Sequence, residues 1–165
     1  MPRDFTHEKL VSWLRYEPST GLFVWLKNRK GVKAGDIAGG DDGRGYMRVK
    51  FCGRNHGAHR LAWFYVHKSW PLGQIDHLNA DRADNRIANL RDVTAQVNVE
   101  NRRKANGNKA ITSPLGVTWH AQCGKWQASI KSHGRNHYLG LYEDSELAHQ
   151  AYVAAKRRLH EGCTI

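Results

Sequence analysis

Apolar positions in the first third of the chain occur in short segments that turn residues separate. Residues 6–14 place apolar side chains, Leu14 among them, on one face of a short helix that Thr6 can cap. Residues 16–25 enclose a Pro-Ser-Thr-Gly sequence, which is typical of a turn, and are predicted to form a hairpin. Residues 31–45 are rich in glycine and are predicted to be a loop.

Residues 46–71 show two patterns of apolar positions, first that of strands and then that of a helix. Residues 46–51 alternate as a strand does, and the turn at 53–55 predicts a second strand that ends near His59. Residues 60–70 then carry apolar side chains at the i, i+3 and i+4 spacing of a helix, which Pro71 closes.

A polar segment between two short apolar ones follows. Residues 74–77 and 90–93 are predicted strands, and residues 78–89 are polar enough to predict a loop between them. Thr94 is positioned to cap a helix that runs toward Arg103. The expected order is therefore strand, long loop, strand and helix within about thirty residues.

The last third of the chain follows a basic segment rich in Asn and Gly, residues 101–114, which has the composition of a linker. Beyond it, a helix that Asp144 or Ser145 can cap presents small residues on one face. Three strands are predicted before that helix, at residues 116–122, 125–131 and 136–142. The expected fold class is α+β, with a module over residues 1–103 (core 46–103), a linker at 104–114 and a small domain at 115–165.

Composition narrows the class of protein. The 165 residues are 40% hydrophobic and include six tryptophans, which is enough apolar material for packed cores. No apolar run has the length of a membrane span, so we expect a soluble, cytoplasmic protein with no membrane partner. Three cysteines without a C-x-x-C pair argue against disulfides and structural zinc. The net charge of +11 favours a polyanionic partner.

Three residues of the polar region suggest chemistry. Asp76 and Asn98 offer hard oxygen ligands, which suit Mg²⁺ and not zinc, and His77 can accept a proton near neutral pH. Asp-His pairs are common, however, and Asn-rich loops usually satisfy their own backbone. From these residues alone, both a metal site for phosphodiester hydrolysis and a purely structural loop remain open.

A longer stretch decides between them. The sequences "HRLAWFY" (59–65), "IDHLNADRADNRIANLRDVT" (75–94) and "QVN" (96–98) resemble the HNH endonuclease family. The resemblance implies a ββα-metal fold in which His77 is the general base and Asp76 and Asn98 bind the metal. It also implies that Asn89, grouped with the catalytic residues, braces the loop. Because the last motif residue is Asn and not His, the match is to the His-Asn-Asn variants common among phage and intron homing enzymes. Arg60 is a candidate phosphate contact, and the alternative is that it starts a helix and points to solvent.

The last fifty residues carry a second resemblance. The "GV" at 116–117, "GKW" at 124–126, "YLG" at 138–140 and "A-x-x-AY" at 148–152 are similar to the Apetala-two, or ethylene-response-factor, DNA-binding domain of plants. In that family the sheet lies in the major groove. Several contact positions are Arg or Trp in the plant proteins and differ here. The candidates that the resemblance implies are Thr118, His120, Ser129, Lys131, Asn136 and Tyr138.

The two resemblances together imply a phage-type homing endonuclease that cuts double-stranded DNA with one Mg²⁺ or Mn²⁺ ion, in the cytoplasm of a bacterial host. Arg102, Arg103 and Lys104 are expected to contact phosphates. A monomer should nick one strand, and a homodimer should cut both. The alternatives are a sequence-specific DNA-binding regulator with an inert nuclease module and a binder of structured RNA.

Overall fold

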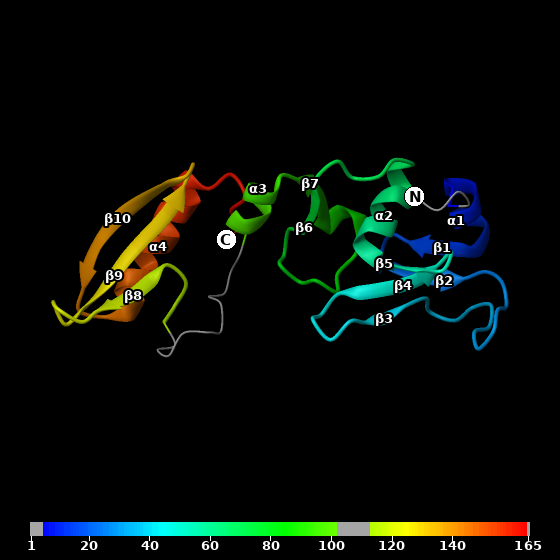
Figure 1. Cartoon of the computed structure of the whole chain (residues 1–165), viewed down its shortest axis with the longest axis horizontal. Coiled ribbons are helices and arrows are strands. Elements are labelled where there is room, and N and C mark those ends of the chain that lie inside the picture. The colour runs from blue at the N-terminus through cyan, green and yellow to red at the C-terminus, as the bar shows by residue number, and fades with distance from the viewer. Residues whose placement is uncertain (1–4, 102–112, 165) are drawn as a thin grey trace. The chain divides into compact units, whose positions relative to one another are not determined.

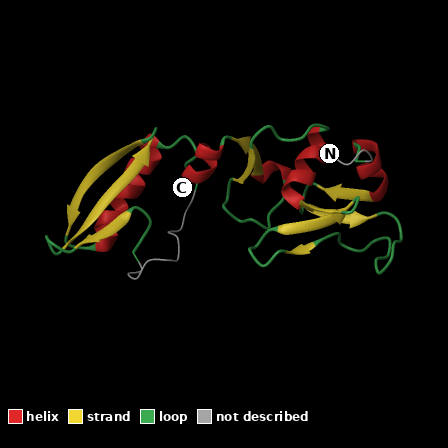
Figure 2. Cartoon of the chain, viewed as in Figure 1, coloured by secondary structure: helices red, strands yellow, loops and turns green. Residues whose placement is uncertain are grey.

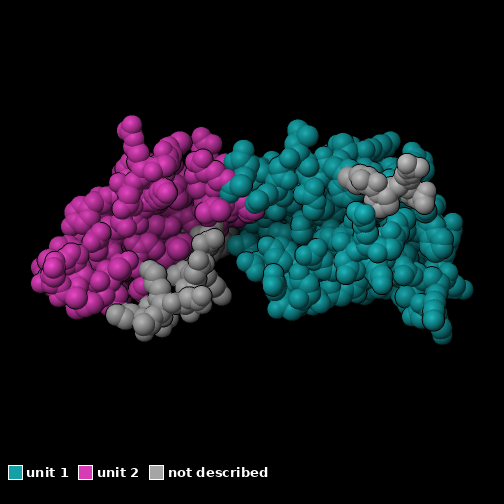
Figure 3. All heavy atoms as spheres, viewed as in Figure 1, with its two compact units in different colours: residues 1–95 teal, residues 96–165 magenta. Residues whose placement is uncertain are grey.

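The computed structural model describes residues 5–101 and 113–164 (Figure 1). It is a mixed fold of helices and small antiparallel sheets, consistent with the predicted α+β class (Figure 2). Two compact units divide the chain, residues 1–95 and residues 96–165 (Figure 3). The predicted boundaries at 103, 104–114 and 115 fall mostly outside the described residues and stay predictions. Within the described segments, no helix combines the length and the apolar character that crossing a membrane requires.

The first unit begins with a helix and a hairpin. Helix α1 spans His7–Trp13, and the Thr6 hydroxyl accepts a hydrogen bond from the Lys9 amide (3.2 Å), as a capping residue should. Strands β1 (Leu14–Glu17) and β2 (Leu22–Trp25) then pair antiparallel. The prediction that Leu14 belongs to the helix was wrong: Leu14 begins β1, where it and Tyr16 alternate into the core.

A three-stranded sheet and a helix complete the core of this unit. The strands β3 (Gly40–Asp41), β4 (Met47–Phe51) and β5 (Arg54–Gly57) lie in the order β3-β4-β5. The region 31–45 was predicted to be entirely loop, but β3 lies within it and pairs with β4. Strand β5 ends at Gly57, near His59 as predicted, and α2 (Ala58–His67) begins at the next residue. Among the largest fully buried side chains of this unit are Leu10, Leu14, Phe23, Val49 and Leu61, from α1, β1, β2, β4 and α2 respectively.

Strands β6 (Gln74–His77) and β7 (Leu90–Val93) form a second hairpin in the first unit. The register places Asp76 opposite Arg91 and His77 opposite Leu90. The connecting loop is as polar as predicted and ends in one turn of 3-10 helix, η1 (Ile87–Asn89). Ile75 and Leu90 anchor the hairpin in the core of the unit, which holds the end of β6 in a fixed place.

The second unit contains a helix, a sheet and a further helix. All but the first residue of α3 (Ala95–Glu100) belong to it, together with β8 (Val117–His120), β9 (Lys125–Ser132) and β10 (Arg135–Tyr142). The sheet order is β10-β9-β8, and α4 (Ser145–Leu159) packs on one face, as predicted. Of the two predicted caps, Asp144 is the one observed, since its carboxylate accepts the amides of Glu146 and Leu147. Gly116 is required because a side chain there would overlap the Tyr152 ring.

Candidate active site

Asp76 and His77 lie side by side at the end of β6, and each is only 5% exposed. The Arg91 guanidinium donates a hydrogen bond from Nε to Asp76 Oδ2 (2.9 Å), and its Nη2 forms an ion pair with the same oxygen at 2.7 Å. Arg91 lies directly opposite Asp76 on β7, so the register of the two strands places the guanidinium beside the carboxylate. A buried carboxylate needs such compensation, and charge-assisted hydrogen bonds provide it.

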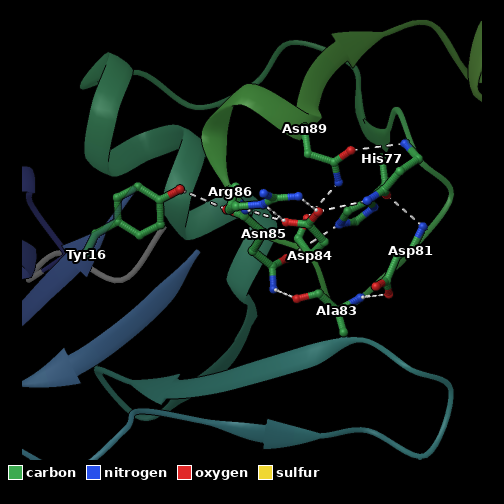
Figure 4. Close-up of polar contacts among 9 residues, drawn as sticks. Tyr16, His77, Asp81, Ala83, Asp84, Asn85, Arg86 and Asn89 are labelled. Carbon is green, nitrogen blue, oxygen red and sulfur yellow. Dashed lines mark hydrogen bonds and ion pairs between the residues drawn. The ribbon is translucent and has the colours of Figure 1, made fainter. Parts of the chain in front are cut away.

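The loop after β6 is held by its own polar side chains (Figure 4). The Asn89 side chain accepts a hydrogen bond from the Asn79 amide (3.0 Å) and donates one to the Asp84 carbonyl (2.9 Å), so it joins both limbs of the loop. Asp84 accepts a hydrogen bond from the Asn79 side chain (2.8 Å) and pairs with Arg86 (2.6 Å). The hydrogen bond from Arg86 is the main reason why the pKa of Asp84 falls to about 2. These bonds give the loop one defined shape.

Asn85 is the most buried residue of this loop, at 1% exposure, and sequence reasoning missed it. Its side-chain nitrogen donates to the Ala83 carbonyl (2.9 Å), which turns its oxygen toward His77 Nε2, 3.5 Å away. Its backbone carbonyl accepts a hydrogen bond from the Tyr16 hydroxyl (2.8 Å). A side chain at Gly21 would overlap the backbone of Asn85 and Arg86, so the first hairpin lies directly against the loop. Both the side chain and the backbone of Asn85 are therefore held in place by contacts with other residues.

The surroundings of His77 determine its protonation. Burial lowers the pKa of its imidazole, while the Asn85 contact and the nearby Asp76 raise it, and the net direction is down. The ring is therefore neutral at pH 7. An amide oxygen facing Nε2 favours the tautomer that carries its proton there, which makes Nδ1 the basic nitrogen.

His59 is a second histidine beside His77 that sequence reasoning did not assign. The two ring centroids are 5.4 Å apart, and the Tyr46 ring lies 5.5 Å from His59 and 6.2 Å from His77. Arg82 covers the Tyr46 ring at 4.9 Å. Burial, followed by the proximity of His77, lowers the pKa of His59 to about 4. The one available signal was its place at the start of the motif-bearing segment 59–65.

The remaining residues that were predicted for the nuclease lie in the first unit, in the second unit or outside the described residues. Arg60, a predicted phosphate contact, extends toward the Gly73 carbonyl (3.4 Å) and lies over the Trp70 ring at 5.9 Å. Asn98 lies half-buried on α3, in the second unit, and its pairing with Asp76 stays a prediction. Arg102, Arg103 and Lys104 lie outside the described residues.

The candidates in the second unit share one face of the sheet. Val117, Ala128 and Ile130 point to α4 and are buried, so the alternate positions point away from it. The register puts Asn136 opposite Lys131, with Tyr138 opposite Ser129. The predicted set of Thr118, His120, Ser129, Lys131, Asn136 and Tyr138 therefore lies on the outer face, joined there by Gln127 and by Leu141, which sequence reasoning did not single out.

The donor atoms bear on which metal the site could hold. Within residues 5–101 and 113–164, no three His, Cys, Asp or Glu side chains gather as a metal cluster would. The proposed donors, a carboxylate and an amide, are hard oxygen ligands that fit Mg²⁺ or Mn²⁺ and leave most positions to water and phosphate. The set does not fit zinc.

Comparison with known proteins matches residues 56–100, 45 of the 165, to the model of the HNH endonuclease family. The match supports an HNH nuclease module. Nuclease activity in general, a nucleic acid substrate and the divalent metal that HNH nucleases generally use follow at the level of the family. The matched segment includes His59, Asp76, His77, Asn85 and Asn89. No curated protein and no solved structure matches the chain.

Proposed function

We propose that this chain is an HNH endonuclease of the homing type that hydrolyses phosphodiester bonds of double-stranded DNA. Support comes above all from His77, a buried and neutral imidazole that lies next to Asp76 inside the matched segment. Asp76 and Asn98 are the proposed ligands of one Mg²⁺ or Mn²⁺ ion, in a ββα-metal arrangement of β6, β7 and α3. Asn89 is the proposed brace of the loop, in keeping with its two hydrogen bonds.

In this proposal His77 takes a proton from the attacking water. Its neutral state at pH 7 leaves a basic nitrogen ready to accept that proton. Asn85 faces the opposite nitrogen and holds the ring in one orientation while the proton moves. When bound, the divalent ion would neutralise charge on the phosphate and on the leaving oxygen. Arg60 is proposed to contact a phosphate.

The outer face of the β8–β10 sheet is the proposed DNA-reading surface, together with phosphate contacts by Arg102, Arg103 and Lys104. Apart from Leu141, its outward side chains are polar or aromatic, and Lys131 adds a positive charge to a chain of net charge +11. A monomer would nick and a homodimer would cut both strands. We also propose that the chain is a phage protein that acts in the cytoplasm of a bacterial host.

One observation favours a second candidate, a sequence-specific DNA-binding regulator with an inert nuclease module. Arg91 already neutralises Asp76, and a metal ion would have to share that carboxylate with a guanidinium. A carboxylate has two oxygens and several lone pairs, so sharing is chemically feasible. Activity therefore distinguishes the two candidates.

The test is incubation of supercoiled plasmid with the purified chain in Mg²⁺, in Mn²⁺ and in EDTA. The nuclease proposal expects nicked or linear product in either metal and intact plasmid in EDTA. Asp76→Ala should lose activity, and Asn98→Ala should weaken it, because the charged ligand contributes more to holding a hard cation than the neutral one. Intact plasmid in every metal, combined with retained DNA binding, would favour the regulator.

A further inference from the structure

Helix α3 is too short to be stable alone. It has six residues, whereas isolated helices of fewer than about 12–15 residues are marginal in water because nucleation is costly. It nevertheless carries Asn98, which is the proposed neutral metal ligand. Whatever holds α3 in shape therefore decides where the Asn98 side chain is presented.

The residues that follow α4 hold α3 in place within the second unit (Figure 1). The Gly162 amide donates a hydrogen bond to Glu100 Oε2 (3.2 Å), and Gln96 donates to the other oxygen of that carboxylate (3.2 Å). The Thr164 hydroxyl donates to the Asn101 side chain. One end of the helix is thus bonded to residues that lie about sixty positions later in the sequence.

The contact is close as well as polar. Glu100 is 8% exposed, and a buried carboxylate without partners would be costly, so its two hydrogen bonds are needed. A side chain at position 162 would overlap the Val97 carbonyl and crowd Glu100 Cβ, so only glycine lets the backbone approach this helix. Val97 directly precedes Asn98 in the helix, and Glu100 follows it by two residues.

We propose that the C-terminal tail, residues 160–164, is a positioning element for Asn98 through the bonds that Gly162 and Thr164 make. Glu100 and Gly162 fix the helix that presents this ligand, although neither touches substrate or metal. The inference rests on the proposed function, in which Asn98 binds the metal. It predicts that removal of the C-terminal unit disturbs the metal site, and not only the recognition of DNA.

The experiment uses the full chain with Gly162→Ala, which forces the tail away from α3. Gly40→Ala is the matched control, because a side chain at position 40 meets open space. A second pair is Glu100→Ala against Glu161→Ala, since Glu161 is an exposed neighbour on the tail. Hydrogen exchange of residues 95–101 reports on the helix without any need for activity. A Mg²⁺ titration of plasmid cleavage reports on the ligand, with Asn98→Ala as reference.

In Gly162→Ala and Glu100→Ala we expect the amides of α3 to exchange about tenfold faster than in wild type. The Mg²⁺ concentration for half-maximal cleavage should rise about tenfold, with partial recovery of the rate at saturating Mg²⁺. The two controls should match wild type. DNA affinity in EDTA should not change in any variant, which separates loss of positioning from loss of binding.

Two results would overturn the inference and leave the proposed function standing. One is unchanged exchange in α3; the other is an unchanged Mg²⁺ requirement in Gly162→Ala while Asn98→Ala raises it. If wild type itself fails to cleave in any metal, the proposed function fails and the positioning role with it.

Discussion

Two polar regions of this molecule are built in opposite ways. In the loop after β6 the polar side chains bond to one another around two buried asparagines, Asn85 at 1% exposure and Asn89 at 7%. On the outer face of the β8–β10 sheet the side chains point to solvent, and Tyr138 is 61% exposed. A buried, bonded network holds reacting groups in one geometry, whereas an open face can adapt to a partner. We therefore expect substitutions in the loop to change rates and those on the sheet to change affinity.

We expect His77→Ala to separate the cleavage rate from DNA affinity most clearly. Cleavage should fall by about 10²–10⁴-fold, because the base acts on a water in the transition state. DNA affinity should stay almost unchanged, since a neutral, buried imidazole contributes little to phosphate binding. Plasmid cleavage and a gel shift in EDTA measure the two quantities. Cutting at the wild-type rate would remove His77 from its assigned role.

Asn85→Ala tests whether the loop orients His77. We expect cleavage to slow by about tenfold, because part of the advantage of a positioned base is lost. The pH profile of the rate should also shift, since the Asn85 contact raises the pKa of His77 and its removal lets that pKa fall further.

The control for this variant is Asn55→Ala, which changes an exposed asparagine of strand β5. Equal rates and equal pH profiles in the two variants would mean that the Asn85 contact has no part in catalysis.

The half-buried His59 should make the first unit sensitive to acid. Its pKa is lowered from 6.5 to about 4 in the folded chain, so below pH 6.5 the unfolded chain binds a proton that the folded chain refuses. The contribution of His59 to the free energy of unfolding should therefore fall by about 3 kcal/mol between pH 6.5 and 4. Below pH 4 this contribution should level off.

Urea unfolding at several pH values, compared between wild type and His59→Gln, isolates this effect from the titration of the carboxylates. Identical pH dependence in the two chains would contradict it.

The smallest effect is expected on the open face. Lys131→Ala should weaken DNA binding by about 1 kcal/mol and lower the salt slope by about one unit if its ammonium contacts a phosphate. If Lys131 contacts a base, the loss should instead depend on sequence. Lys125→Ala is a suitable control, because Lys125 is already paired with Glu143 at 2.7 Å.

A gel-shift salt titration on several duplexes distinguishes these outcomes. Unchanged affinity and slope on every duplex would mean that this face is only solvated.

Local signals made much of the fold predictable. Thr6 and Asp144 cap the helices that they were expected to cap, because capping depends on a few adjacent residues. The strands around Asp76 and those of the C-terminal sheet follow from alternation. Strand β3 did not, because two residues in a glycine-rich segment have no periodicity and are fixed by their pairing with β4.

The surroundings of His77 were less predictable, because they too depend on contacts between residues that are distant in sequence. Asn85 looked like any residue of a polar turn, and nothing local reveals that a tyrosine 69 positions earlier bonds its backbone. The place of His59 beside His77 also depends on how α2 packs near β6, which no spacing rule gives. The roles of Asp76, His77 and Asn98 came from the family resemblance and await the experiments above.

The bond from Tyr16 to Asn85 also has a consequence for synthesis on the ribosome. The first hairpin leaves the exit tunnel well before its partner loop exists, so its turn at Gly21 has nothing to lie against for most of the time that the unit is being made. Contacts so distant in sequence close late and slow the folding of the whole unit. We therefore expect an incompletely folded nascent chain whose positive charge already allows it to bind nucleic acid, although its proposed nuclease site has not yet formed.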